Sequence, residues 1–183
     1  MSLMHERRFN HEIERLRDPE RVARLEVPRV VDLALSGMQK PSKVLDMGSG
    51  TGLFTEEFAA RGLQVTGMDV NPEMLAAAQE FVPTGVFQEG LAEQIPYPDT
   101  TFDLVFMGLL LHETDDPLAA LKEARRVTRQ RLAILEWPDE DQSIGPPREH
   151  RLATVKINKL ARQAGFMKVD ISRLENLVLY IME

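Results

Sequence analysis

The sequence contains no cysteine among its 183 residues. Disulfide bonds, zinc–thiolate sites and a cysteine nucleophile are therefore excluded, and this composition fits a protein of a reducing cytoplasm. Long apolar runs are also lacking, since no stretch approaches the roughly 18 residues that a membrane-spanning helix needs. Charged residues from His5 onward leave no room for the apolar segment of a secretory signal. We therefore expect a cytoplasmic protein without a membrane span.

Basic residues are in the minority, with 22 Lys and Arg against 29 Asp and Glu, which gives a net charge of −7. This balance argues against broad binding of nucleic acid, which depends on neutralising phosphates. The main basic cluster has no interleaved aromatic residues that could stack on bases. Its members are Lys122, Arg125, Arg126, Arg129 and Arg131. We interpret the cluster as a solvated helix face and expect no nucleic-acid partner.

Short apolar runs alternate with stretches of helical character along most of the chain. The pattern predicts strands at 43–47, 64–69, 86–89, 102–107, 131–137, 168–172 and 176–182. It predicts helices at 9–16, 28–36, 53–61, 72–81, 117–127 and 154–164. Such alternation is typical of an α/β fold with a parallel sheet covered on both faces.

No helix separates the last two predicted strands, so we expect them to pair as an antiparallel hairpin. The predicted fold class is therefore a Rossmann-like, seven-stranded, mostly parallel sheet with one antiparallel strand and helices on both faces. The length fits a single globular unit. Within it we expect an N-terminal helical segment over residues 1–40, packed on a domain over residues 41–183.

A glycine-rich turn, Val44–Gly52 with the sequence VLDMGSGTG, lies where the first strand hands over to a helix. Glycines at alternate positions allow a tight turn and a close approach to a ligand. The dinucleotide-binding pattern G-x-G-x-x-G needs a third glycine where this chain has Leu53. Asp46 precedes the first glycine by two residues, and a carboxylate there suits an ammonium or sulfonium better than a pyrophosphate. A tight turn without a ligand is the alternative interpretation.

Asp69 ends the second predicted strand, where an acidic residue can accept hydrogen bonds from both hydroxyls of a ribose. The alternative is that Asp69 caps the next helix. Asn71 already supplies that cap, with Pro72 in the first helical position. Asp69 by itself does not distinguish nicotinamide cofactors from other ribose-containing ones.

Four segments carry a resemblance to a known family: VLDMGSGTG, VTGMDVNPEML, GLAEQIPYPD followed by TFDLV, and LHE followed by DPL. Together they resemble the class I S-adenosylmethionine-dependent methyltransferases, in particular the small ubiquinone/menaquinone-biosynthesis-type enzymes. The resemblance covers roughly Val44 to the C-terminus. It implies S-adenosylmethionine as cofactor and methyl transfer to an O, N or C atom of a small-molecule acceptor, with donor and acceptor oriented for an in-line displacement.

The resemblance also implies a set of cofactor-binding residues. The residues are Asp46, Gly48, Ser49, Gly50, Asp69, Val70, Met74, Leu91, Ala92 and Met107. The glycine turn would hold the methionine part, and Asp69 would hold the ribose. Val70 and Met74 would cover the adenine, Leu91 and Ala92 would flank its edge, and Met107 would lie beside the ammonium end. The family often has Asp where this chain has Leu91, which predicts weaker adenine recognition unless Glu93 reaches in. It also often has Pro-Gly-Gly where Thr128–Arg131 forms a shorter connection.

No catalytic triad is evident, and we expect no metal site. Methyl transfer from a sulfonium depends chiefly on orientation and on exclusion of water, so catalytic residues stay unassigned, with His112, Glu136 and His150 as the candidates. His112 could instead bond to backbone and hold its loop, and Glu136 could serve as a cap. His150 and Arg151 follow a loop from Pro138 that could fold over the acceptor and contact an anionic group.

The resemblance also predicts that the N-terminal segment, including Phe9, covers the cofactor or the acceptor. Two other functions remain open. One is a module that binds S-adenosylmethionine or S-adenosylhomocysteine without transfer, or that assists a partner subunit. The other is a nicotinamide oxidoreductase, which Leu53 disfavours. The sequence leaves the oligomeric state undetermined.

Overall fold

A seven-stranded sheet forms the centre of the computed structural model. The structure describes residues 13–183, so the predicted helix start at residue 9 and Phe9 lie outside the described residues. The strands are β1 (Lys43–Met47), β2 (Gln64–Asp69), β3 (Val86–Glu89), β4 (Phe102–Gly108), β5 (Thr128–Glu136), β6 (Val169–Arg173) and β7 (Val178–Met182). Their order is β3-β2-β1-β4-β5-β7-β6. Only β7 runs antiparallel to its neighbours, β5 and β6. The predicted fold class is confirmed.

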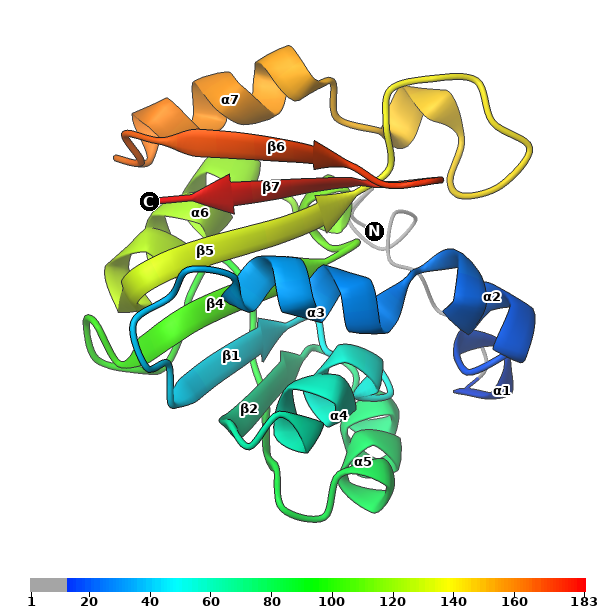
Figure 1. Cartoon of the computed structure of the whole chain (residues 1–183), viewed down its shortest axis with the longest axis vertical. Coiled ribbons are helices and arrows are strands. Elements are labelled where there is room, and N and C mark those ends of the chain that lie inside the picture. The colour runs from blue at the N-terminus through cyan, green and yellow to red at the C-terminus, as the bar shows by residue number, and fades with distance from the viewer. Residues whose placement is uncertain (1–12) are drawn as a thin grey trace, which may run out of the picture.

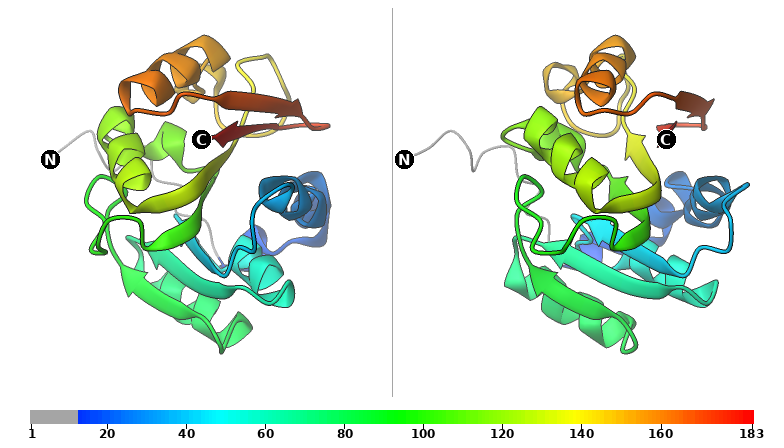
Figure 2. Two further views of the ribbon diagram at one scale, coloured as in Figure 1. Left: turned by 60° about the vertical axis from the view of Figure 1, so that its left-hand side comes forward. Right: turned by 90° about the vertical axis from the view of Figure 1, so that its left-hand side faces the viewer.

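Helices cover both faces of this sheet (Figures 1 and 2). They are α1 (Ile13–Leu16), α2 (Pro19–Arg24), α3 (Val27–Leu35), α4 (Leu53–Ala60), α5 (Pro72–Phe81), α6 (Pro117–Val127) and α7 (Thr154–Gln163). One hydrophobic cluster joins α3, α4 and the end of α5 to one face. The other cluster joins α6 and α7 to the opposite face. Single 3-10 turns lie at η2 (Leu111–Glu113) and η3 (Arg148–His150).

The alternation of side chains along the central strands divides the core between the two faces. In β4, Leu104 and Phe106 belong to the cluster under α3 and α4, whereas Val105 and Met107 belong to the cluster under α6 and α7. All four are fully buried. A strand buried on both faces needs a continuous apolar run, which is why the sequence pattern located these strands well.

The structure departs from the predicted elements at two places. The first helix ends at Leu16, as predicted, but Asp18-Pro19 then starts an unpredicted helix, α2: Asp18 Oδ1 accepts hydrogen bonds from the Glu20 and Arg21 amides, and Pro19 occupies the first turn. Thr128–Arg131 was expected to form a connection, but these residues are already part of β5. The Thr128 hydroxyl donates to the Ala124 carbonyl at 2.6 Å, so helix passes into strand without a loop.

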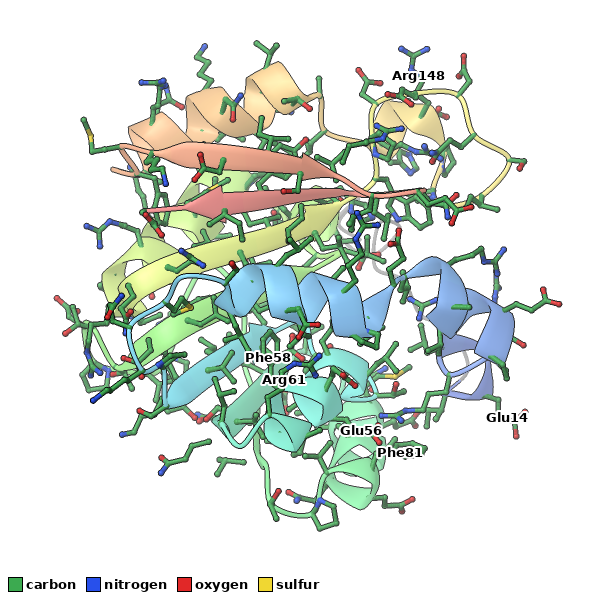
Figure 3. All side chains as sticks on the ribbon, in the orientation of Figure 1. Glu14, Glu56, Phe58, Arg61, Phe81 and Arg148 are labelled. Atoms are coloured by element: carbon green, nitrogen blue, oxygen red, sulfur yellow. The ribbon has the colours of Figure 1, made fainter. Side chains whose placement is uncertain are left out.

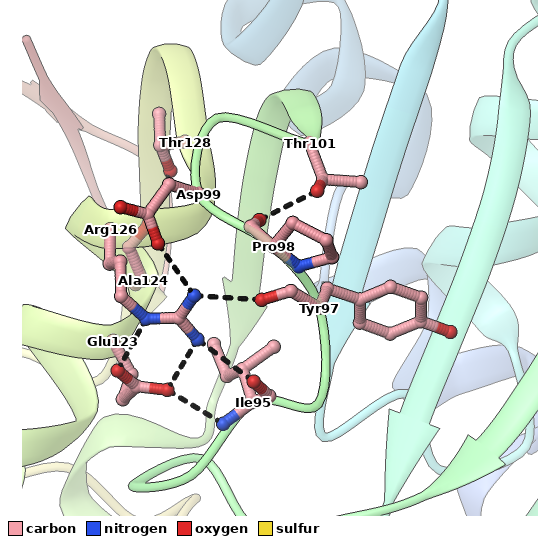
Figure 4. Close-up of polar contacts among 9 residues, drawn as sticks. All are labelled: Ile95, Tyr97, Pro98, Asp99, Thr101, Glu123, Ala124, Arg126 and Thr128. Carbon is pink, nitrogen blue, oxygen red and sulfur yellow. Dashed lines mark hydrogen bonds and ion pairs between the residues drawn. The ribbon is translucent and has the colours of Figure 1, made fainter.

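The basic cluster of the sequence is not simply a solvated face. The Arg126 guanidinium donates to the carbonyls of Ile95 and Tyr97 and pairs with Glu123 and Asp99 (Figure 4). It thereby fastens the loop between β3 and β4 to α6.

Two further members of the cluster also have defined partners. Arg129 pairs with the buried Asp103 at 2.7 Å. Arg131 is buried and donates to the carbonyls of Ala34 and Ser36. The spacing of the charges along the chain predicted that these side chains are exposed. It could not show that other segments supply backbone carbonyls as partners for them.

The parallel strands all end at one edge of the sheet. Figure 1 shows α1, α2 and the loop between β5 and α7 beyond that edge, on the side toward which the β5 arrowhead points. Ligands of open α/β sheets bind at this carboxyl edge, where the strand order reverses. The reversal here falls between β1 and β4. Across residues 13–183 the structure has no helix long and apolar enough to cross a membrane.

Candidate cofactor and acceptor site

The glycine turn after β1 is fastened to the end of β2. Gly48, Gly50 and Gly52 have φ values of +66°, +52° and +76°, in the left-handed region that glycine adopts without strain. The amides of Gly48 and Ser49 donate to the Met68 carbonyl at 2.7 and 3.0 Å. The Gly50 amide donates to Asp69 Oδ2 at 2.9 Å. The turn therefore places Gly50 directly beside Asp69.

These bonds limit what the turn can bind. A pyrophosphate is held by free backbone N–H groups at such a turn, but the amides of Gly48, Ser49 and Gly50 are already engaged by β2. Gly50 keeps open space beside it, since a Cβ added to Gly50 would have Leu16 Cδ1, at 3.9 Å, as its nearest neighbour. The geometry favours a ligand that lies against the turn without a phosphate.

A cavity of about 630 Å³ opens at this point of the sheet edge. Most of the predicted cofactor residues line it, namely Gly48, Ser49, Gly50, Asp69, Val70, Met74, Leu91 and Ala92. Of the catalytic candidates, His112 lines it. The residues among the predictions that do not line it are Asp46, Met107, Glu136 and His150.

Asp46 and Met107 lie behind the cavity wall. Met107 is fully buried in the cluster under α6 and α7, and Gly108 to Leu110 form the wall in its place. Asp46 is 2% exposed and accepts a hydrogen bond from the Thr55 hydroxyl at 2.6 Å. Burial raises the pKa of the Asp46 carboxyl to about 7; the Thr55 bond lowers it, and the nearby Asp69 carboxylate raises it further. Asp46 therefore lies one layer behind the lining of the cavity.

Asp69 is positioned by two backbone bonds. Its Oδ2 accepts from Gly50 and its Oδ1 accepts from the Asn71 amide at 2.9 Å. Asn71, not Asp69, caps α5, because its side chain accepts from the Glu73 amide. A carboxylate offers about four acceptor sites, so Asp69 keeps capacity for two ribose hydroxyls.

One wall of the cavity follows β3 and lacks an acidic group at its expected place. Leu91 is 44% exposed there, a large apolar side chain at the surface of the cavity. Glu93 also lines the cavity, but its Oε1 accepts hydrogen bonds from the amides of Asp115 and Asp116 at 3.0 and 3.3 Å. Glu93 therefore stabilises the turn before α6.

His112 and Glu136 form a buried pair that sequence spacing had not joined. Glu136 Oε2 lies 2.8 Å from His112 Nδ1, and its Oε1 accepts from the His112 amide at 3.1 Å. His112 Nε2 is 3.8 Å from Glu113 Oε1. Burial lowers the pKa of the His112 imidazole, but the Glu136 carboxylate, with Glu113, raises it by more, so the net shift is upward.

The loop between β5 and α7 forms another wall, with Trp137 and residues 143–146 at the cavity. Arg151 organises this loop from inside, since it is 8% exposed and donates to the carbonyls of Pro138, Glu140, Ile144 and Pro146. Arg151 thus shapes the wall and does not face the cavity. His150 is exposed on η3, away from the cavity.

Sequence reasoning missed several lining residues from other elements. These are Leu16, Arg21, Arg24 and Leu25 of the N-terminal helices and Gly90 after β3. The only signal for the first group was the general expectation that an N-terminal segment covers the site. Among residues 13–183, no group of three or more His, Asp or Glu side chains is placed to hold a metal ion.

The fold and the site together define a Rossmann-like, single-sheet protein with a cavity at the switch point of its sheet, the position at which open α/β sheets bind ligands. The comparisons with known proteins name the family. A family model described as "Methyltransferase domain" matches residues 45–133. The domain over these residues belongs to the class I S-adenosylmethionine-dependent methyltransferases, whose cofactor is S-adenosylmethionine.

Individual relatives agree with this assignment. A crystal structure of a SAM dependent methyltransferase from Aquifex aeolicus superimposes with a TM-score of 0.78 at 27% identity, over 93% of this chain and 95% of that one. An uncharacterized methyltransferase of Mycobacterium tuberculosis is 36% identical over 67% of this chain and 49% of its own length. A demethylmenaquinone methyltransferase of Chlorobaculum tepidum is 38% identical over 52% of this chain and 39% of its own length. The chain thus spans half or less of these two curated relatives.

Proposed function

We propose that this protein transfers a methyl group from S-adenosylmethionine to an O, N or C atom of a small-molecule acceptor. The observation that carries the proposal is the glycine turn bonded to the end of β2, which sets Gly50 beside Asp69 at the edge of a cavity large enough for a cofactor and a second small molecule. The family assignment supports it. We also propose a division of the chain at residue 40 and a cytoplasmic location.

The residues at the cavity fit the donor. The Ser49 hydroxyl is buried and, among the described residues, has no hydrogen-bond partner, so a polar group of a ligand can satisfy it. Together with Gly48 and Gly50 it would hold the methionine part, and Asp69 would accept from the ribose hydroxyls.

The adenine would lie between two segments of the cavity wall. Val70 and Met74 line one part and Leu91 and Ala92 the other. Asp46 and Met107, which lie behind the wall, would act through the field of the carboxylate and through packing. The donor supplies a methyl group already activated by a positively charged sulfur, so the protein's main tasks are orientation and exclusion of water.

For an O–H or N–H acceptor we propose His112 as the proton acceptor. Glu136 fixes Nδ1 as the protonated nitrogen, and since Glu136 lies behind the cavity wall, Nε2 is the nitrogen that can reach an acceptor. The donor, when bound, would supply the activated methyl group, and Nε2 would take the acceptor's proton as the acceptor atom replaces sulfur on the methyl carbon. Glu136 then stabilises the imidazolium. Glu136 acts as a positioning residue, and His150 has no role in this scheme.

Calorimetric titration with S-adenosylmethionine and S-adenosylhomocysteine tests the donor site. Asp69→Ala should weaken both ligands at least about tenfold, because each ribose hydroxyl loses a charged acceptor. Asp170→Ala, which removes a carboxylate from the exposed strand β6, is the matched control and should bind normally. Equal affinity in Asp69→Ala and wild type would refute the assignment.

One observation favours a second candidate, a module that binds the cofactor without transfer. Leu91 leaves the adenine edge without a carboxylate, and Glu93 is engaged with the turn before α6. A methyl-release assay over a panel of hydroxylated and amino acceptors separates the two candidates. Donor binding without turnover of any acceptor favours the module, whereas formation of S-adenosylhomocysteine favours the enzyme.

A further inference from the structure

Three arginines of the N-terminal helices line the same cavity. Arg15 belongs to α1, and Arg21 and Arg24 lie three residues apart on one side of α2. Side chains of the glycine turn and of the β5 loop line the cavity with them. A single guanidinium at a cavity wall needs no explanation, but three together create a concentrated positive charge.

The charge of Arg21 and Arg24 is poorly compensated. Burial lowers the pKa of the Arg21 guanidinium, and the positive charges of Arg24 and Arg15 lower it further, with no carboxylate among the causes. Arg21 donates to the Leu16 carbonyl at 2.7 Å. Within residues 13–183, Arg24 takes part in no hydrogen bond or ion pair. Asp18 is close in sequence, but its carboxylate caps α2.

Arg17, in contrast, is fully compensated, and it fixes the cluster in place. Its guanidinium donates to the Thr51 carbonyl and to Glu56, each at 2.7 Å, and lies 3.5 Å from the centre of the Phe81 ring. Figure 3 labels Glu56 and Phe81, which lie on the side of α4 and α5 that faces α1. These bonds fasten the N-terminal helices to the glycine turn. The helices therefore cannot move away to separate the arginines of the cluster.

The cluster borders more than one part of the cavity, because Leu16, next to Arg15, lies 3.9 Å from a Cβ added to Gly50 of the glycine turn. Leu25 follows Arg24 directly, is 3% exposed, and belongs to the hydrophobic cluster against which Leu109 and Trp137 pack. Leu109 and Trp137 are also cavity residues on the side of β4 and β5. The other carboxylates of the lining, apart from Asp18, belong to Asp69, Glu93, Glu113 and Asp115.

We propose that the arginine cluster is an anion subsite for the acceptor, so that the molecule methylated carries a carboxylate or a phosphate. This inference rests on the proposed function, because it assigns one end of that cavity to the donor. An anion relieves the repulsion among three guanidiniums and forms charge-assisted hydrogen bonds with them. The donor has one carboxylate of its own, which cannot neutralise both Arg21 and Arg24.

The test uses Trp137, the single tryptophan of the chain, as a fluorescent reporter inside the cavity. Wild-type protein with saturating S-adenosylhomocysteine is titrated with benzoate, phenyl phosphate and the uncharged analogue benzyl alcohol, and calorimetry repeats each titration. We expect the anions to bind at least about tenfold more tightly than benzyl alcohol. Comparison of benzoate with phenyl phosphate shows which anion the subsite prefers.

Charge-removal variants show whether the arginines cause the preference. Arg21→Gln/Arg24→Gln should abolish it, and Arg24→Gln alone, at an exposed side chain without bonds, should reduce it without affecting folding. Lys159→Gln/Arg162→Gln removes two charges from α7, outside the cavity, and should leave the preference unchanged.

The outcomes separate this inference from the proposed function. If S-adenosylhomocysteine binds to wild type but the anions show no advantage, or keep it in the double variant, the anion subsite is refuted and the methyltransferase proposal stands. If the double variant loses S-adenosylhomocysteine affinity and keeps the anion preference, the arginines serve the donor's carboxylate and the inference is again wrong. Failure of wild type to bind S-adenosylhomocysteine contradicts the proposed function itself.

Discussion

Replacement of Arg126 by methionine tests how the cavity wall is supported. Arg126 donates to the partly buried carbonyls of Ile95 and Tyr97 at 2.8 and 2.7 Å. Methionine keeps much of the side-chain length and removes these bonds. Each net hydrogen bond of this kind contributes about 1 kcal/mol. The pair with Asp99, whose side chain is 74% exposed, contributes little because water screens it.

The expected loss is therefore about 2 kcal/mol of unfolding free energy, which corresponds to a fall in Tm of about 4–8 °C for a domain of this size. Glu123 continues to accept from the Ile95 amide at 2.8 Å, so the loop should loosen without detaching. Because Leu91 and Ala92 belong to the same loop, we also expect weaker binding of S-adenosylhomocysteine, although Arg126 does not line the cavity.

Urea denaturation and calorimetric titration measure the two effects. Lys122→Met is the control, since it removes an exposed positive charge from the same helix and should change stability by no more than about 0.5 kcal/mol. If Arg126→Met were as stable as Lys122→Met, the carbonyl bonds of the guanidinium would not hold the loop and the reasoning would be refuted.

The remaining predictions concern the glycine turn, the buried histidine and the buried Asp103. Gly50→Val places a β-branched residue at φ +52°, which should cost about 1–2 kcal/mol of stability and abolish donor binding in a titration. Gly37→Val is the control, because Gly37 has φ +75° and lies away from the cavity; it should lose as much stability but bind the donor normally. Glu136→Gln removes the carboxylate that raises the pKa of His112, so the acid limb of the kcat/KM profile should move to lower pH while the plateau rate falls. For Asp103, burial raises the carboxyl pKa, but the amides of residues 42 and 43 and the hydroxyl of residue 42 bring it down to about 2. A carboxyl whose pKa is depressed in the folded state stabilises the fold at pH values above its ordinary pKa of 3.8, and this stabilisation is lost as the pH falls toward 2. Asp103→Asn should therefore lower the unfolding free energy by about 2 kcal/mol at pH 7, and the difference from wild type should shrink between pH 4 and 2.

Each of these has a contradicting result. Donor binding by Gly50→Val at wild-type strength would remove the glycine turn from the site. An unchanged acid limb in Glu136→Gln would show that His112 does not titrate in the reaction. A stability difference for Asp103→Asn that stays constant from pH 7 to 2 would mean that its bonds do not depend on charge.

The sequence located the central strands because burial on both faces leaves a direct pattern. Lys43–Met47, Gln64–Asp69 and Val86–Glu89 were predicted with the bounds that the structure has. The glycine turn and Asp69 were found for a related reason: a turn that excludes side chains, and a carboxylate at the end of a strand, are local requirements that local sequence expresses.

What the sequence could not give depends on contacts between distant segments. His112 and Glu136 are 24 residues apart, and only the pairing of β4 with β5 brings them together. The partners of Arg126 and Arg151 are mainly backbone carbonyls, which every residue has and no sequence pattern marks. At Asp18-Pro19 the same residue types both end and begin helices, so the pattern was ambiguous and the start of α2 was missed.

The central claim is that the cavity bordered by the glycine turn and Asp69 receives S-adenosylmethionine. A crystal structure with S-adenosylhomocysteine, the stable product, tests it most directly. We predict density for the nucleoside with both ribose hydroxyls within hydrogen-bond distance of Asp69 and the amino-acid end against Gly48–Gly50. Density for the ligand elsewhere, or a cavity that side chains fill in crystals grown at saturating ligand, would contradict the account.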